Sequence, residues 1–124
     1  MREILFRGKT KNELPSRWIF GSLTDVVHKW FIDDYKTNAR VITETIGQYT
    51  GIKDINGEKI FEGDIVRCKK MDSEYIVIVE WADLLAGYHL KYLDKATYLC
   101  ELAFAYDIEV IGNRWDTPEL LKNE

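Results

Sequence analysis

The chain has 124 residues, of which 46% are hydrophobic, 31% charged and 13% aromatic. Lys and Arg number 17 and Asp and Glu 21, so the net charge is −4, which excludes a strongly basic polyanion-binding protein. The aromatic content excludes a disordered chain, and the length fits one domain whose core needs neither metal nor disulfide.

The first part of the chain shows strand patterns separated by polar loops. Residues 4–6 are a short apolar run, and residues 18–23 are aromatic and β-branched, as strands prefer. Residues 26–32 are expected to return beside 18–23, with Thr24 and Asp25 as a two-residue turn. Residues 33–38 read as a polar loop, and residues 40–46 begin like a strand that ends at Gly47.

Two turn signals follow in the middle of the chain. Asn56 and Gly57 both tolerate positive φ, so they predict a primed hairpin turn. Gly63 and Asp64 predict a sharp entry into the next strand, where the Asp64 carboxylate accepts local backbone N–H groups.

The second half of the chain predicts an antiparallel β structure. We expect strands at 64–69, 75–81, 87–93 and 107–112, with the continuously apolar 75–81 at the centre. Gly112 and Asn113 end the last strand. Residues 94–106 fit either one helix face or two short strands, and we favour a strand or an irregular segment because the surroundings are β. Thr117 before Pro118 predicts a short C-terminal helix.

Charge is unevenly distributed along the chain. Residues 1–40 hold 8 basic and 5 acidic groups (+3), residues 41–80 hold 5 and 8 (−3), and residues 81–124 hold 4 and 8 (−4). The basic first third contains Arg7, Lys9, Lys11 and Arg17 close to Trp18, the combination of cations and rings that single-stranded nucleic-acid binders use. The alternatives are a chance fluctuation in charge and a solvated loop beside a core tryptophan.

The residues with catalytic potential all have structural explanations. Glu62 and Asp64 flank a glycine, which suits a turn better than a carboxylate pair. Cys68 lacks the flanking signature of a thiol enzyme, and His28 and His89 lack metal-ligand spacing. We therefore expect no catalytic, metal or cofactor site, and a protein that is not an enzyme.

The sequence also indicates where the protein works. No apolar run approaches the length of a membrane span, and Glu3 interrupts the apolar start, so no signal peptide is expected. Cys68 and Cys100 predict a cytoplasmic protein with two buried thiols, although a single disulfide between them stays open.

Three blocks of sequence resemble the YopX family of phage and prophage proteins. They are residues 43–51 (TETIGQYTG), 53–57 (KDING) and 60–66 (IFEGDIV), and the resemblance extends over nearly the whole chain, with an insert-like departure at 94–105. It implies a small, mainly β domain from a phage or prophage, located in the host bacterial cytoplasm and without an established activity or transferable site residues. The positions that we assign to its structural motifs are Gly47, Gln48, Tyr49, Gly51, Asn56, Gly57, Gly63, Asp64, Gly112 and Asn113.

We predict one mainly β domain. Residues 59–113 form a small SH3-like, partly open barrel, residues 1–58 add an N-terminal β layer, and residues 114–124 form a C-terminal tail or helix.

The leading functional hypothesis is an accessory protein that binds a protein partner or a second copy of itself. The chain has more tryptophans than so small a core needs, namely Trp18, Trp30, Trp81 and Trp115. Aromatic residues are favoured anchors at protein interfaces. The alternative is a nucleic-acid-binding module that uses Arg7 and its basic neighbours. No membrane or metal partner is expected.

Overall fold

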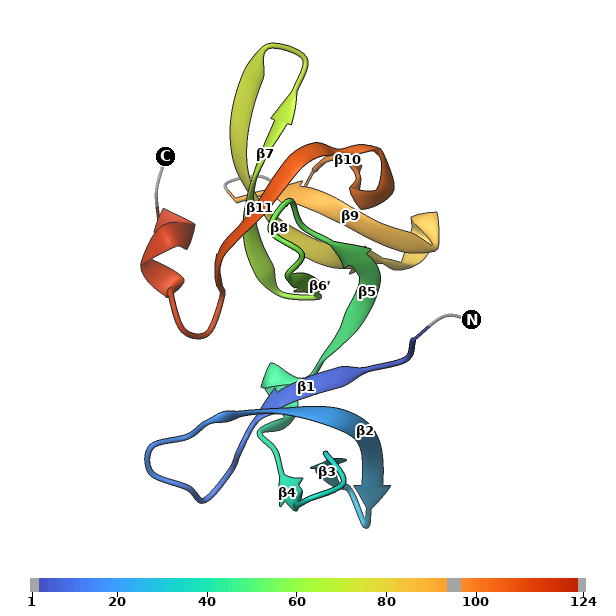
Figure 1. Cartoon of the computed structure of the whole chain (residues 1–124), viewed down its shortest axis with the longest axis vertical. Coiled ribbons are helices and arrows are strands. Elements are labelled where there is room, and N and C mark those ends of the chain that lie inside the picture. Colours follow the sequence, from blue (N-terminus) through green and yellow to red (C-terminus); the bar gives the residue numbers. More distant parts are fainter. Residues whose placement is uncertain (1–2, 94–96, 123–124) are drawn as a thin grey trace. The chain divides into compact units, whose positions relative to one another are not determined.

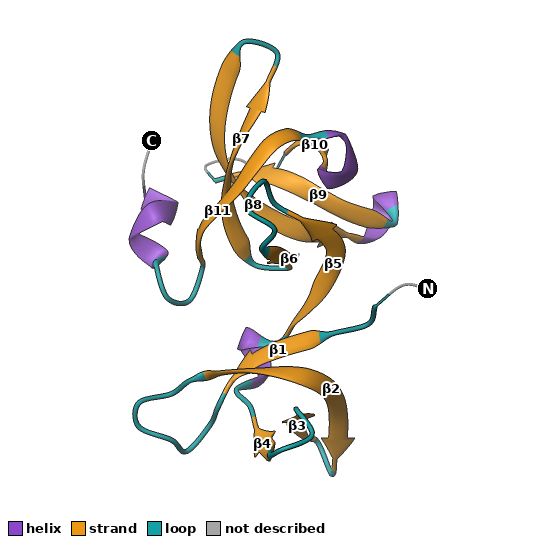
Figure 2. Cartoon of the chain, in the orientation of Figure 1, coloured by secondary structure: helices purple, strands orange, loops and turns teal. Residues whose placement is uncertain are grey.

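The computed structural model describes residues 3–93 and 97–122, and it is mainly antiparallel β with short 3₁₀ turns (Figures 1 and 2). The prediction of a mainly β protein is confirmed. The chain divides into two compact units, residues 1–51 and residues 52–124, where the sequence suggested a change of layer after residue 58.

The first unit is built on a sheet with the strand order β4-β3-β2-β1-β5. Its strands are β1 (Phe6–Lys9), β2 (Trp18–Val26), β3 (Lys29–Asp33), β4 (Asn38–Arg40) and β5 (Gly47–Lys53), and the 3₁₀ turn η1 (Thr43–Thr45) precedes β5.

This sheet curls so that its two distant strands approach each other. An isolated bridge joins Thr10, just after β1, to Val41, just after β4. Beside it the Lys11 N–H donates to the Arg40 carbonyl at 2.8 Å. The curl encloses a small core formed by Ile19, Ile32 and Val41, with Phe6, Leu23, Trp30, Ala39 and Ile46 packed against it.

The hairpin between β2 and β3 turns at Val27 and His28, not at Thr24 and Asp25 as predicted. Val27 and His28 have φ of 50° and 63°, while Thr24 pairs with Phe31 inside the ladder. The prediction was wrong because Thr24 and Asp25 lie on the exposed end of the hairpin, where polar side chains remain in contact with water and can stay in the strand without a desolvation cost. The apolar Val27 takes the turn although its side chain is 81% exposed.

The second unit contains a five-stranded antiparallel sheet with the order β10-β9-β8-β7-β11. Four expected strands are confirmed as β7 (Asp64–Lys70), β8 (Ser73–Ala82), β9 (Gly87–Tyr92) and β11 (Tyr106–Asn113), with β8 at the centre. β6 (Lys59–Phe61) precedes them, and η2 (Asp83–Leu85) connects β8 to β9. The described strands do not close into a barrel, and the SH3-like arrangement stays a prediction.

The segment 94–106 and the C-terminus contain no long helix in the part that the structure describes. β10 (Tyr98–Glu101) is followed by the 3₁₀ turn η3 (Leu102–Phe104), as the preference for strand or irregular structure anticipated, and residues 94–96 lie outside the described residues. The expected C-terminal helix is the 3₁₀ segment η4 (Pro118–Lys122). Thr117 does not act as its simple N-cap, because its hydroxyl accepts the Asn113 N–H at 2.9 Å.

The core of the second unit is larger than that of the first. Its buried cluster consists of Ile60, Val66, Cys68, Val77, Val79, Leu90, Leu102 and Ile108. Cys68 is 1% exposed within this cluster, whereas Cys100 is half-buried and not buried as expected. The two cysteines are not joined by a disulfide, which answers the open question of their pairing.

Candidate nucleic-acid interface

The register of β1 and β2 places cations and rings on the same face of the first unit. Arg7 pairs with Phe20 and Lys9 pairs with Trp18. Side chains of directly paired residues point to the same side of a sheet. Because Ile19 between the two rings points into the core, these four side chains point outward.

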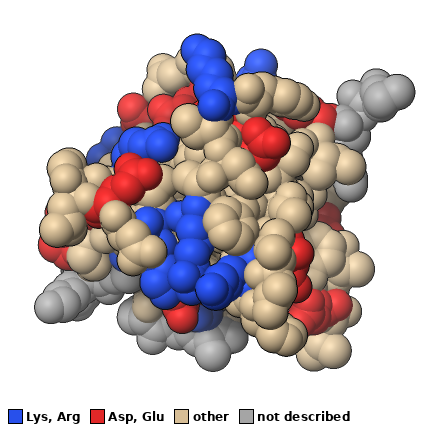
Figure 3. All heavy atoms as spheres, turned by 90° about the horizontal axis from the view of Figure 1, so that it is seen from below, with Lys and Arg blue, Asp and Glu red and all other residues tan. Residues whose placement is uncertain are grey.

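The outward face continues over β3 and β4. Phe31 pairs with Thr24 on one side and with Arg40 on the other, and Lys29 pairs with Val26. Figure 3 shows Lys and Arg side chains gathered in a view onto this unit. We define the outer basic face as Arg7, Lys9, Trp18, Phe20, Lys29, Phe31 and Arg40, together with Lys11 at its edge, where the Lys11 N–H donates to the Arg40 carbonyl.

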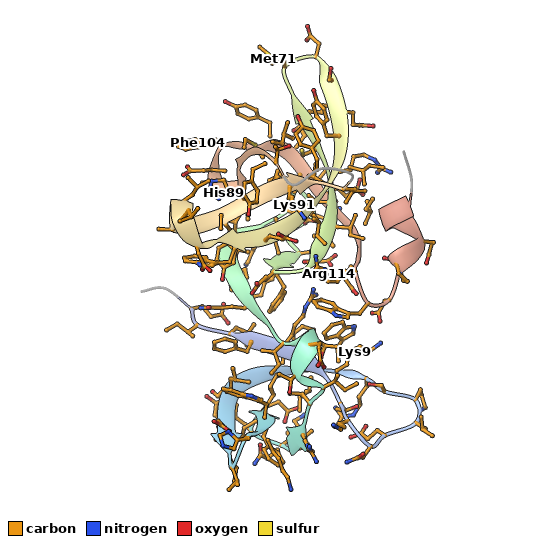
Figure 4. All side chains as sticks on the ribbon, turned by 180° about the vertical axis from the view of Figure 1, so that it is seen from behind. Lys9, Met71, His89, Lys91, Phe104 and Arg114 are labelled. Carbon is orange, nitrogen blue, oxygen red and sulfur yellow. The ribbon has the colours of Figure 1, made fainter. Side chains whose placement is uncertain are left out.

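The Trp18 ring lies under two cations. The guanidinium carbon of Arg7 is 4.6 Å from the ring centroid, and the Lys9 Nζ is 5.6 Å from it. Each such contact contributes about 0.5–2 kcal/mol, depending on how far water is excluded. Arg7 is itself only 7% exposed, so it orients the indole more than it offers charge to solvent. Lys9 is labelled in Figure 4.

The rest of the face is more accessible and strongly biased in charge. Phe20 is 44% exposed, and Lys11 and Lys29 are exposed. Within strands β1 to β4, the one carboxylate on this side is Asp33, and its Oδ1 accepts the Tyr35 N–H at 2.8 Å. Within strands β1 to β4 this side therefore carries four cations, Arg7, Lys9, Lys29 and Arg40, against one carboxylate, although the whole chain has a net charge of −4.

Of the four basic residues singled out from the sequence, three lie on this face. Arg17 does not, because it precedes β2 and stands next to the outward-facing Trp18 in the chain, and its Nε donates to Glu13 Oε1 at 3.0 Å in an exposed ion pair. Sequence reasoning missed Phe20, Phe31 and Arg40 as part of the same face. The alternation in each strand contained the signal, but only the cross-strand register shows that the alternating positions meet.

The Gly47–Gly51 motif forms the strand next to β1. Gln48 pairs with Phe6, Gly47 pairs with Arg7, and the Tyr49 N–H donates to the Leu5 carbonyl at 2.8 Å. The roles that the structure shows for this motif are therefore backbone pairing, and Gly51, with φ of 88°, ends the unit.

The turn after β5 is organised by Asp54. Its Oδ1 accepts the N–H groups of Asn56 and Glu58, both at 2.9 Å, and its Oδ2 accepts that of Val110 at 3.0 Å. Gly57 has φ of 81°, but Asn56 does not have a positive φ. The predicted primed turn needs positive φ at both of these residues, as in type I′, so the turn that forms is a different one. The carboxylate holds Asn56 in place instead.

These donors also set the pKa of Asp54. Burial of the carboxyl acts to raise its pKa, but the three backbone N–H donors outweigh burial and hold the pKa below its ordinary value. The Asp54 carboxylate is therefore a structural group that joins the turn to β11.

The Gly63–Asp64 pair forms the turn between β6 and β7. Asp64 is 2% exposed, and its Oδ2 accepts the Phe61 N–H at 2.8 Å. A carboxylate that is buried and bonded in this way is not accessible to a substrate, so it does not form an open carboxylate pair with Glu62. Gly63 has φ of 93° and lies against the Trp115 ring, where a Cβ would overlap the indole.

The end of β11 is a capped turn. Asn113 Oδ1 accepts the N–H groups of Trp115 and Asp116, at 3.0 and 2.9 Å. At the preceding position a Cβ on Gly112 would overlap the Thr117 hydroxyl. Both residues therefore shape the exit from the sheet.

The two histidines lie in different parts of the chain. His89 is 4% exposed with its Nδ1 3.0 Å from the Gly87 carbonyl oxygen, whereas His28 lies in the β2–β3 turn. Lys91 and Arg114, labelled with His89 in Figure 4, both reach Glu80, at 3.9 and 2.9 Å. Residues 3–93 and 97–122 contain no group of three or more His, Cys, Asp or Glu placed to hold an ion.

No helix in the described part of the chain combines the length and apolar character that crossing a membrane requires.

Comparison with known proteins identifies a family. No curated protein matches the chain. Among solved structures, the crystal structure of protein EF1440 from Enterococcus faecalis is similar, with a TM-score of 0.46 and 26% identity, covering 93% of this chain and 74% of that one. The family model described as YopX protein matches residues 8–122, nearly the whole length. The chain therefore belongs to the YopX family.

Proposed function

We propose that this protein is a nucleic-acid-binding accessory protein that acts through the outer basic face of its first unit. The observation that carries the proposal is the strand register, which brings four cations and three aromatic rings onto one side of a curled sheet. The proposed setting is the one that the YopX resemblance implies, a phage or prophage protein in the host cytoplasm.

The chemistry of the face suits a phosphate backbone. Lys and Arg side chains neutralise phosphates and release counterions, which supplies much of the affinity and makes it depend on salt. The net charge of −4 does not prevent this, because at physiological ionic strength charges beyond about 8–10 Å are screened. A local excess of cations therefore decides what the face attracts.

The proposal is tested with two double variants that change the charge equally. Lys11→Gln with Lys29→Gln removes two exposed cations from the outer basic face, and Lys53→Gln with Lys69→Gln removes two exposed cations from other strands. Arg7 is left intact because it is only 7% exposed and its guanidinium contacts the Trp18 ring. Binding to labelled DNA and RNA is followed by fluorescence anisotropy over a salt series.

We expect the face variant to bind more weakly at low salt and to reduce the slope of log K against log salt by about 1.4–1.8, as loss of two phosphate contacts requires. The control variant should match the wild type. Equal behaviour of the two variants, or no binding at low salt, refutes the proposal.

A second candidate, binding of a protein partner, rests on apolar side chains of the second unit. Leu84 in η2 is 100% exposed, Leu85 is 54% exposed and Phe104 in η3 is 71% exposed. Figure 2 shows these two 3₁₀ turns at the same end of the five-stranded sheet. Exposed apolar side chains that gather in this way favour a protein interface.

The tryptophans lend this second candidate less support than the sequence suggested. Trp81 is 45% exposed, but Trp115 packs on Gly63 and Trp30 packs against the first core. Sedimentation of the wild type and of Leu84→Ser with Phe104→Ser tests it. A concentration-dependent oligomer of the wild type that the variant no longer forms would support self-association. If the wild type and the variant both sediment as monomers, self-association is excluded.

A further inference from the structure

We infer that the outer basic face selects single-stranded nucleic acid over duplex. This inference rests on the function proposed above and narrows its ligand. Three features carry it: the exposure of an aromatic ring, the curvature of the sheet and a groove beside Lys11.

The first feature is the ring of Phe20. It is 44% exposed and stands opposite Arg7 in the ladder, next to the Trp18 ring on the same strand. Residues two apart in a strand are about 6.6–6.8 Å apart along it. An exposed ring beside cations gains by stacking with a base, and only an unpaired base can offer its π face. In a duplex both faces of each base are already stacked.

The second feature is the convex shape of the face. The outer basic face lies on the outside of the sheet, because the inside encloses Ile19, Ile32 and Val41, and the Thr10–Val41 bridge draws the sheet round (Figure 1). Duplex DNA is stiff over about 150 base pairs. A stiff rod touches a small convex surface over a short stretch, whereas a single strand follows the curve and reaches cations on several strands.

The third feature is a groove at the edge of the face. It has a volume of about 760 Å³ and lies between the loop of residues 10–16 and Ile42. Its wall contains Lys11, the fully exposed Leu14 and Glu13, whose carboxylate is paired with Arg17. Pockets for drug-sized molecules measure roughly 300–1,000 Å³, so the groove has room for a splayed nucleotide. A base enters such a groove only after leaving its stack, which costs least in a single strand.

The inference is tested by titrating the full chain with labelled oligothymidylate of about 20 nucleotides and with the same strand annealed to its complement. Phe20→Ala removes the ring, and Phe20→Leu keeps an apolar side chain without a π face. Tyr106→Ala, which removes a 71% exposed ring from the second unit, is the matched control. Thermal unfolding of each variant confirms that it folds.

We expect the single strand to bind at least about tenfold more tightly than the duplex. Both Phe20 variants should weaken single-strand binding by about 5- to 150-fold, the range for loss of one stacked base, and leave duplex binding unchanged. Duplex binding as tight as single-strand binding, or Phe20 variants that bind the single strand like the wild type, overturns the inference. If the Lys11 and Lys29 variant still weakens binding in that case, the proposed function stands, and if no oligonucleotide binds, both fail.

Discussion

Replacing Gly63 with alanine should be among the most destabilising small substitutions in the second unit. Two independent costs meet at this position. The backbone has φ of 93°, a region that residues with a Cβ avoid, and the added methyl group would overlap the Trp115 ring. Gly57 separates the two costs, because it has φ of 81° and no atom lies within 4 Å of the Cβ position there.

The expected magnitudes follow from these contacts. A left-handed backbone costs alanine about 1–2 kcal/mol, which is the whole cost expected for Gly57→Ala. Forcing a methyl group into a filled site costs about a further 1–3 kcal/mol. Gly63→Ala should therefore lower the free energy of unfolding by about 2–5 kcal/mol, a large share of the 5–15 kcal/mol typical of a small protein.

Urea unfolding followed by far-UV circular dichroism measures both variants, and Trp115→Ala completes the test. In the Trp115→Ala background the overlap is gone, so Gly63→Ala should cost only about 1–2 kcal/mol, like Gly57→Ala. A Gly63→Ala cost that is equal in the two backgrounds would refute the assignment of Trp115 as the obstacle. A cost no larger than that of Gly57→Ala would refute it as well.

Three further outcomes follow from the described contacts. The pKa of Asp54 is lowered in the folded state, so its carboxylate stabilises the protein above about pH 4, and this stabilisation is lost as the pH falls through the folded pKa. Asp54→Asn should therefore lower the Tm at pH 7, and the Tm of the variant should fall less steeply in acid than that of the wild type. Parallel profiles of Tm against pH would contradict this. Gly21→Ala should unfold the first unit, since its Cβ would overlap the Asp33 carbonyl, as loss of the amide NMR dispersion of that unit would show. Cys68 should resist a thiol reagent until the protein unfolds, whereas the half-buried Cys100 should react earlier.

Much of the second unit could be predicted from sequence because its strands are strongly patterned. Val77 and Val79 belong to a long β-branched run between polar turns, and such a run has few alternatives to a central strand. The turns were harder. Val27 adopts a left-handed backbone despite its branched side chain, because the pairing of β2 with β3 fixes which residues remain at the tip. The turn preferences of single residues therefore do not determine the position of this hairpin turn, because the pairing of the two strands does.

The candidate interface was partly predictable for the same reason. Lys9 and Lys11 drew attention because they are close to Trp18 in sequence. Arg40 lies far from them along the chain. It joins the face because it pairs with Phe31, and the curl of the sheet brings it beside Lys11, whose N–H donates to the Arg40 carbonyl. Such long-range pairing depends on how the whole sheet closes, and this cannot be predicted from the alternation of residues within one strand.

The unequal cores of the two units have a consequence for how the protein opens. Among the described residues, the buried cluster of the first unit contains three side chains and that of the second contains eight. Less buried apolar surface means a smaller free energy for local opening. The backbone amides of β2 and β3 should therefore exchange their hydrogens with solvent faster than those of β7 and β8. A ligand held on the outer face of the first unit would be read out as slower exchange there, because binding lowers the population of the opened state.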